Sequence, residues 1–303
     1  MATPQGGWVP AEGHAEGDAI TMREALRVSS NRAASRTLQG VGIQQAVDLA
    51  GTMGLGVMPS VPSLALGAGE VTLLSLTSAF AAFASEGMVR QPTFIRRVTS
   101  SSGEVLYQAA PVERRGMSPA TAYLMTSMLE DVMNSGTASG VRRMGFTLPA
   151  AGKTGTTDDY RDAWFVGYTP NVVAGAWVGY DTPRTIMRGG YAAELAVPLW
   201  TRFMLAVTST AAPTPFQMPA SITSVEICRL TGKRATDDCR GHEGMTYSEH
   251  FQVGTEPDDS CRHPGFWRDL VSGPPERLLT MAPVEAPATK KRGFWGRLFG
   301  RRE

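Results

Sequence analysis

The feature that most constrains this fold is a change of residue pattern near residue 145. Helix-type patterns dominate before it, and three strand-like runs follow it: "GFTLPAAGKTGTT", "DAWFVGYTP" and "VVAGAWVGYD". Asp-rich and Pro-Asn turns separate these runs, and short turns of this kind join antiparallel strands. The sequence therefore predicts an antiparallel meander packed against helices, which is an α+β arrangement.

Helices are predicted on both sides of the meander. Thr21 and Glu24 have the spacing of a capping box, which predicts a helix that runs to about Gly40. Ser118 and Pro119 predict the start of a long helix that ends near Gly136. Further helices are expected at 43–50, 71–85 and 194–207, the last lying on the sheet, and a small hairpin is expected to turn at 101–103.

Length and composition limit the classes of protein. The 303 residues, with 42% hydrophobic and 19% charged residues, suit one large or two ordinary globular domains. A net charge of +1 argues against a nucleic-acid-binding protein. The apolar run at 71–84 is too short to span a bilayer, so a buried helix is predicted there. The Pro-rich segment "TSTAAPTPFQMP" predicts a boundary, with one domain at 1–210 and an extension at 211–303.

The three cysteines, Cys228, Cys239 and Cys261, all lie in this extension. Their spacings match no C-x-x-C zinc pattern, so no metal site is expected, even with His263 close to Cys261. Two alternatives stay open. One disulfide with a leftover thiol suits an oxidising compartment, whereas three buried thiols need no particular compartment.

Lys153 lies in "GKT", which is similar to the end of a phosphate-binding loop. That loop needs a glycine at position 147, where this chain has Thr147, and it must lead into a helix that faces the phosphates. Here a strand-like run follows instead, and Asp158 and Asp159 would repel a phosphate. Lys153 is therefore expected to bind another anion, unless it is an ordinary lysine on a solvated strand.

Lys-Thr-Gly also belongs to the motif set of β-lactamases and penicillin-binding proteins. Four stretches occur here in one order: "ITMREALRVSSNRAASRTL", "SLALGAGEVTLLSLTSAFAAFASEG", "YLMTSMLEDVMNSGTASGVR" and "AAGKTGTTDDYRDAWFVGYTPNVVAGAWVGYD". Over about residues 8–207 the chain resembles the transpeptidase domain of a bifunctional (class A) penicillin-binding protein. The resemblance implies the α+β penicillin-binding-protein/β-lactamase-like transpeptidase fold, with a sheet covered by helices and an all-helical lobe.

The resemblance gives the strand of Lys153 a role in substrate binding. Lys153 and the hydroxyl of Thr154 would bind the carboxylate of a stem peptide that ends in D-Ala-D-Ala, or the carboxylate of a β-lactam. Gly155 would let the substrate backbone lie against the strand. The backbone N–H of Thr156 would be one donor of the oxyanion hole.

The family's S-x-N motif matches Ser29, Ser30 and Asn31. Ser29 would relay protons to the leaving group, and Asn31 would bind the substrate amide and the general-base lysine. The alternative is an ordinary polar stretch of helix. Two further stretches, 136–137 and 162–164, are expected to shape the cleft.

Aromatic residues of the second and third predicted strands need a separate interpretation. Trp164, Phe165 and Trp177 are expected to pack in the core rather than to stack on a ligand, because aromatic side chains on strands usually pack.

The family's nucleophile motif, Ser-x-x-Lys, does not occur in this sequence. Ala150, Leu230, Pro287 and Ala288 stand three residues before the four lysines. The resemblance places this motif upstream of S-x-N, so Met1 is expected to mark a truncation. A glycosyltransferase domain and a membrane anchor are expected upstream as well. The stretch at 1–19 has no secretory signal, which by itself would indicate a cytoplasmic protein.

The resemblance implies peptidoglycan cross-linking on the periplasmic side of the cytoplasmic membrane, with no cofactor. Stem peptides, the lipid-linked precursor polymer and β-lactams would be the partners, and no nucleic acid. Two alternatives remain: a non-catalytic fragment that binds peptidoglycan or a partner protein, and a β-lactamase-type hydrolase.

The end of the chain has two further features. "GTEPDDSCRHPG" resembles a C-terminal extension of some of these synthases. The segment 290–303 combines six cationic residues with Phe294, Trp295, Leu298 and Phe299. This pattern is typical of a helix at an anionic membrane surface, and a basic tail in solution is the alternative.

Overall fold

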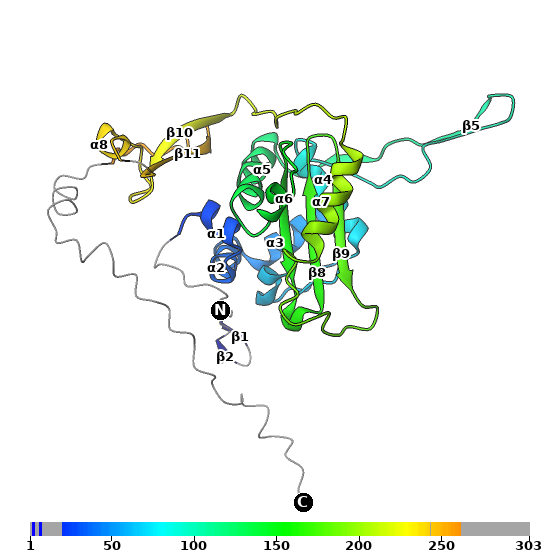
Figure 1. Cartoon of the computed structure of the whole chain (residues 1–303), viewed down its shortest axis with the longest axis horizontal. Helices are drawn as coiled ribbons and strands as arrows, with labels where there is room; N and C mark the ends of the chain where they lie inside the picture. The colour runs from blue at the N-terminus through cyan, green and yellow to red at the C-terminus, as the bar shows by residue number, and fades with distance from the viewer. Residues whose placement is uncertain (1, 4–5, 8–19, 243, 262–303) are drawn as a thin grey trace, which may run out of the picture.

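The computed structural model describes residues 2–3, 6–7, 20–242 and 244–261 (Figure 1). The central body holds a sheet with helices on both faces, and a small C-terminal unit lies beside the helices α1 and α5. His263 and the segment 290–303 lie outside the described residues, so the predictions made for them stay predictions.

The predicted antiparallel meander is confirmed. Strands β7 (Ala151–Thr156), β8 (Asp162–Tyr168) and β9 (Val173–Gly179) form a three-stranded antiparallel sheet in the order β7-β8-β9. Lys153 pairs with Val166, and Trp164 pairs with both Gly155 and Trp177. Among the described residues, β7 has a strand neighbour on one side only, so Lys-Thr-Gly lies on an edge strand.

One face of the sheet is covered by α7 (Ala196–Val207), close to the predicted range. Trp200 lies at the centre of this contact and is 1% exposed. Its indole N–H lies 3.2 Å from the carbonyl oxygen of Gly167 and 3.0 Å from that of Ala174, and its ring meets the edge of Phe165. Any side chain at 167 would overlap the Trp200 ring, which explains the glycine.

The other face packs against α4 (Leu73–Ala84) and α5 (Pro119–Asn134). The side chains of Ser118 and Thr72 cap these helices by accepting from backbone N–H groups, as Ser118-Pro119 predicted. Tyr168 is buried between the helices, and its hydroxyl shares a 2.9 Å hydrogen bond with that of Thr126. The predicted helix at 71–85 is only partly buried, because Leu74 remains 46% exposed.

The prediction of one helix from Thr21 to Gly40 is wrong. The capping box does start α1 (Met22–Val28), but a second helix, α2, covers Asn31–Val41. Ser29 ends α1 in the left-handed region, with φ 61° and ψ 49°. Ser30 then caps α2 by accepting from the N–H of Ala33 at 3.1 Å. The S-x-N motif therefore lies at a break between helices, not within one.

The remaining elements of the body are short. They are α3 (Ile43–Thr52), η1 (Pro62–Leu66), α6 (Gly140–Arg143), η2 (Asp158–Tyr160) and the paired strands β3 (Met88–Arg90) with β6 (Glu113–Arg115). The predicted hairpin is confirmed as β4 (Arg97–Thr99) and β5 (Val105–Gln108), and it projects from the body (Figure 1). A further pair of strands consists of β1 (Ala2–Thr3) and β2 (Gly6–Gly7).

We use the name C-terminal unit for residues 222–261. It consists of β10 (Ile222–Cys228), α8 (Asp237–Arg240) and β11 (Thr246–Gln252), with the two strands antiparallel. Arg23 of α1 joins it to the body through ion pairs with Glu249 of β11 and Asp131 of α5. The separate-domain boundary at residue 210 stays a prediction.

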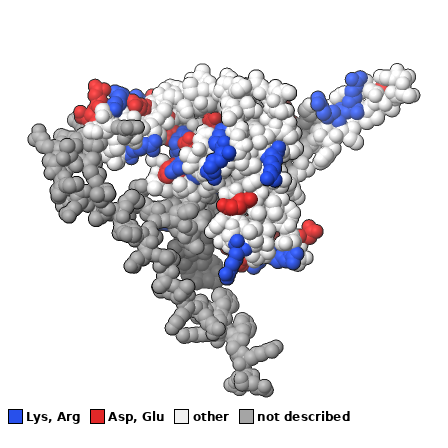
Figure 2. All heavy atoms as spheres, viewed as in Figure 1, with Lys and Arg blue, Asp and Glu red and all other residues white. Residues whose placement is uncertain are grey.

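The distribution of surface charge and the length of the helices show which contacts the described residues can make. On the face in Figure 2, the described basic and acidic side chains are scattered, with groups of both signs on the C-terminal unit. Within the described parts of the chain, no helix is both long and apolar enough to cross a membrane.

Candidate active site on the edge strand

Lys153 lies in the middle of β7, on the same face of the sheet as its pairing partner Val166. Its Nζ atom donates to the hydroxyl of Ser29 at 2.7 Å and to the carbonyl oxygen of Thr154 at 3.1 Å. Residues 124 positions apart in the chain thus meet at one hydrogen bond. The structure therefore brings the predicted Lys-Thr-Gly strand and S-x-N motif together.

The electrostatic setting of Lys153 is unusual for a lysine. Burial by the surrounding protein disfavours its charged form and lowers its pKa to about 8. Lys153 has no ion pair with an acidic residue in the described ranges, so only neutral oxygens contact its Nζ atom there. An anionic ligand would therefore stabilise the charged form of Lys153.

The break between α1 and α2 places Ser29 against Lys153. A left-handed residue outside glycine is uncommon and is kept only where its surroundings require it. The N–H of Ser29 still bonds to carbonyls of α1, which fixes its position as a helix C-cap. Asn31 begins α2 two residues later, and its carbonyl accepts from Ser35.

A turn after α5 connects the two parts of the site. The N–H of Thr137 donates to the carbonyl of Arg27 at 3.3 Å, and the hydroxyl of Thr137 lies 2.7 Å from that of Thr154. A Cβ atom on Gly136 would lie 2.5 Å from the Arg27 carbonyl oxygen, so only glycine allows this approach. The stretch 136–137 therefore fixes α1 next to β7.

The far end of β7 is tied to neighbouring loops. The hydroxyl of Thr156 accepts from the N–H of Ala192 at 3.0 Å, which anchors the segment before α7. Asp162 accepts from the Trp177 indole at 2.9 Å and from the Thr157 hydroxyl at 3.2 Å. These contacts hold the end of the sheet where Gly155 and Thr156 lie.

The three strand aromatics divide between the two faces. Phe165 is fully buried against Trp200, which confirms the prediction that it packs in the core. Trp164 and Trp177 are half-buried and pack on each other, with ring centres 6.1 Å apart. Neither tryptophan belongs to the buried core, so the prediction is confirmed for Phe165 alone. Trp164 lies beside Gly155, on the face of Lys153.

A cavity also lies away from Lys153, among the described residues. It measures about 1000 Å³ and lies between α1, α5 and the C-terminal unit. Its lining includes Arg23 and Glu130, and burial, with a smaller effect of nearby Asp131, raises the pKa of Glu130 to about 7. Lys153 instead lies on an edge strand, and an edge strand suits a ligand that binds in an extended conformation.

Two features of the site were not predicted from the sequence. The helix break has a local signal in hindsight, because Ser30 and Asn31 are both good N-cap residues and follow Ser29 directly. The contact of Gly136 with the Arg27 carbonyl has no such signal, since it depends on how two distant segments dock.

Comparison with known proteins gives the family. The model of the penicillin-binding protein transpeptidase domain family matches residues 2–199, which is most of the chain. A second family model, for the C-terminal domain of penicillin-binding protein 1A, matches residues 218–264. The chain therefore belongs to the penicillin-binding protein transpeptidase family, and the resemblance inferred from the motifs is confirmed.

Curated relatives agree with this assignment. The chain is 34% identical to penicillin-binding protein 1A of Aquifex aeolicus over 255 residues, which cover 84% of this chain and 34% of that protein. It is 35% identical to penicillin-binding protein 1A of Neisseria flavescens over 210 residues, covering 67% of this chain and 26% of that protein. The chain thus spans about a third or less of these relatives.

Solved structures confirm the fold. Penicillin-binding protein 1A from Haemophilus influenzae matches with a TM-score of 0.78 and 24% identity, over 86% of this chain and 44% of that chain. The PonA1 protein from Mycobacterium tuberculosis in complex with penicillin V matches with a TM-score of 0.60 and 26% identity, over 68% of this chain and 61% of that chain. The predicted α+β transpeptidase fold is therefore confirmed.

Proposed function

We propose that this chain provides the substrate-binding strand and the S-x-N segment of a serine D-Ala-D-Ala transpeptidase that cross-links peptidoglycan. The observation that carries the proposal is the contact of Lys153 Nζ with the Ser29 hydroxyl at 2.7 Å. It joins the two motifs that the resemblance assigns to one active site. The family assignment and the name of the relatives, penicillin-binding protein 1A, support the same function.

The edge position of β7 supports the mode of substrate binding. A stem peptide that ends in D-Ala-D-Ala would lie along β7 as an added strand, with Gly155 leaving room for its backbone. Its terminal carboxylate, or that of a β-lactam, would bind Lys153 and the hydroxyl of Thr154. At close range and intermediate dielectric, such a charge pair is worth about 4 kcal/mol before desolvation is subtracted.

The polar groups around the strand would act on the reacting peptide. The hydroxyl of Thr137 lies 2.7 Å from that of Thr154, and this hydrogen bond fixes the orientation of the Thr154 hydroxyl. The N–H of Thr156 would stabilise the developing oxyanion, and loss of one such donor typically slows a reaction about 100- to 1000-fold. Ser29 would relay a proton to the leaving group, and Asn31 would bind the substrate amide.

The covalent step needs groups that this sequence does not contain. In the proposed reaction, a serine oxygen outside this chain's sequence attacks the penultimate carbonyl carbon, forms an ester and releases D-Ala. An amine of a second stem peptide then attacks the ester, forms the cross-link and frees the serine. This chain contains no Ser-x-x-Lys, so the serine and its lysine base would come from a preceding segment.

The alternatives differ in what they require of the same residues. A non-catalytic fragment would bind stem peptides or a partner protein without acylation. A β-lactamase-type hydrolase would need a water-activating group, and the match to a penicillin-binding protein 1A C-terminal domain at 218–264 favours the synthase.

Location belongs to the same proposal. The substrate implies work at the outer face of the cytoplasmic membrane, with the lipid-linked precursor polymer as the source of stem peptides. An anchor would then precede this chain, and the segment 290–303 would add a contact with anionic lipid headgroups.

The test measures reversible binding of an N-acylated D-Ala-D-Ala dipeptide to the full chain by NMR titration. The matched ligand is its C-terminal amide, which lacks the carboxylate. We expect the acid to bind more tightly than the amide, and Lys153→Ala to reduce binding of the acid to the level of the amide. Lys233→Ala removes a surface lysine that pairs with Asp259 and is the control. Equal binding of acid and amide, or equal effects of both substitutions, would refute the proposal.

A further inference from the structure

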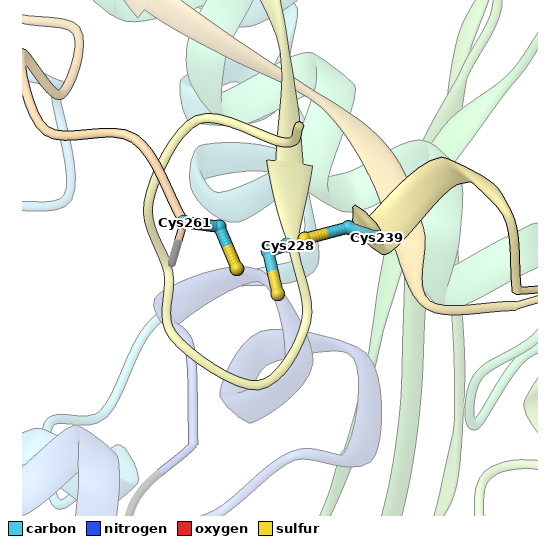
Figure 3. Close-up of side chains that lie close together, drawn as sticks. All are labelled: Cys228, Cys239 and Cys261. Carbon is cyan, nitrogen blue, oxygen red and sulfur yellow. The ribbon is translucent and has the colours of Figure 1, made fainter. Parts of the chain in front are cut away.

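The C-terminal unit gathers its three cysteines at one point. Cys228 ends β10, Cys239 lies in α8, and Cys261 follows β11. Their sulfur atoms all lie within 4.8 Å of one another. Figure 3 shows the three side chains converging from three separate segments. Each residue is 1% exposed or less.

Backbone hydrogen bonds hold these segments in place. The N–H of Cys228 donates to the carbonyl of Lys233 at 2.9 Å, which closes the loop after β10. Arg234 then bridges two segments, because its N–H donates to the carbonyl of Asp259 at 3.0 Å and its carbonyl accepts from Cys261 at 2.8 Å. The positions of the sulfurs are therefore set by the main chain and do not depend on side-chain rotamers alone.

The cysteines also form a buried cluster in this unit, which in addition buries Ile222 and Ile227. The buried apolar cluster around them consists of Cys228, Ala235, Cys239 and Cys261, with no large side chain. Units of this size rarely bury enough apolar surface to be stable and commonly use disulfides or a structural metal. The unit's salt bridges, such as Arg240 with Glu226 and Lys233 with Asp259, are exposed and add little.

We propose that Cys228, Cys239 and Cys261 bind one zinc ion as three thiolates. Tetrahedral zinc with Zn–S bonds of about 2.3 Å places its sulfurs about 3.8 Å apart, so the observed cluster needs only small shifts. Ordinary cysteine thiols hold their protons at neutral pH. A divalent ion would displace them.

The binding step balances without any oxidant. Three thiols and Zn²⁺ give a zinc trithiolate of net charge −1 and release three protons, and a water molecule or another donor fills the fourth position. A disulfide uses only two of the three cysteines and needs an oxidant to take two electrons. The irregular spacing in the sequence argued against a metal site, but the fold brings the ligands together from the end of β10, the short helix α8 and the segment after β11.

The experiment uses the full chain, reduced and freed of metal by a chelator. It is titrated with Zn²⁺ in the presence of a pH indicator, and with Co²⁺ in a parallel titration. We expect one metal per chain, close to three protons released per zinc at neutral pH, and a thiolate-to-cobalt charge-transfer absorption. Cys239→Ser should abolish that absorption and weaken zinc binding at least 100-fold. Asp238→Asn, at an exposed neighbouring residue, is the matched control and should change neither.

Thiol counting on the zinc-loaded chain separates the metal from the disulfide. After denaturation and chelation, alkylation should modify three cysteines, as seen by mass spectrometry. Modification of only one, with the other two joined, would overturn the proposal. It would also be overturned if the reduced wild-type chain bound Zn²⁺ no more tightly than Cys239→Ser. Neither outcome depends on the Lys153 site, so the proposed transpeptidase function would stand.

Discussion

The two sides of the candidate site are built differently. The sheet side, β7–β9 with α7, surrounds a core in which Trp200, Phe165 and Tyr168 are almost fully buried. The helical side, α1–α3 with η1, buries little, and no residue of α3 is buried. It leaves Leu49 49% and Val57 97% exposed. Lys153 belongs to the sheet side and Ser29 to the helical side.

This difference in packing means that Lys153 is held more firmly than Ser29. Lys153 lies on a strand whose position is set by the packed core. Ser29 lies on helices held by a few polar contacts, chiefly Arg23 with Asp131 and the approach of Gly136 to the Arg27 carbonyl. Segments with few buried apolar contacts open at lower free energy than the core. We therefore expect changes on the helical side to alter the site before they unfold the chain.

The largest expected effect concerns the nucleophile motif Ser-x-x-Lys, which neither side contains. Because the sequence has no Ser-x-x-Lys, we expect this chain to form no covalent adduct with a labelled penicillin. Intact-mass spectrometry after prolonged incubation gives the answer. A stable serine-linked adduct, located by peptide mapping, would show that one of the two sides carries a nucleophile that we have not recognised.

The next effect compares the two sides in stability. Trp200→Ala should lower the free energy of unfolding by about 3–5 kcal/mol, because it empties the centre of the core. Leu38→Ala in α2 should cost about 2 kcal/mol, at the low end for such changes, because the neighbouring helices can relax into the space. Urea unfolding of both variants measures the difference. Equal costs would mean that the helical side is as firmly packed as the sheet side.

A smaller loss of stability is expected from a change in the turn at Gly136, which lies between the sheet side and the helical side. Gly136→Ala places a Cβ atom 2.5 Å from the Arg27 carbonyl oxygen, so α1 must move away from β7. Strain of this kind typically costs about 1–3 kcal/mol. Gly145→Ala, at a glycine with φ +90° but open space around it, is a control for backbone strain without a clash. If dipeptide binding drops equally in both variants, Gly136 does not position the helical side.

The sequence predicted the sheet side better than the helical side for a physical reason. The meander and α5 follow from local signals, namely short turns, strand-type runs and the Ser118-Pro119 cap. The capping box at Thr21 predicted one helix instead of two, although Ser30 and Asn31 are a local signal for a second helix start. The docking of Ser29 against β7 has no such signal in the sequence. The cysteine cluster was missed likewise, since its spacing in sequence gives no hint of the bridge at Arg234.

The central claim is that Lys153 is a desolvated cation that awaits a carboxylate, and it predicts a pH dependence. A bound carboxylate favours the charged lysine and raises its pKa, so affinity should be full below pH 8 and fall as the pH rises through about 8. Lys153→Arg should bind the acid with little pH dependence in this range, because arginine stays charged.

The most direct measurement is the titration of Lys153 itself by NMR of lysine side chains labelled with ¹³C and ¹⁵N. The chain has only four lysines, and Lys153→Arg identifies the signal that belongs to residue 153. We predict a pKa of about 8 for the free chain and a clear rise when the acylated D-Ala-D-Ala acid is added, but not its amide. A pKa near the ordinary lysine value of 10.5 that neither ligand changes would contradict the account.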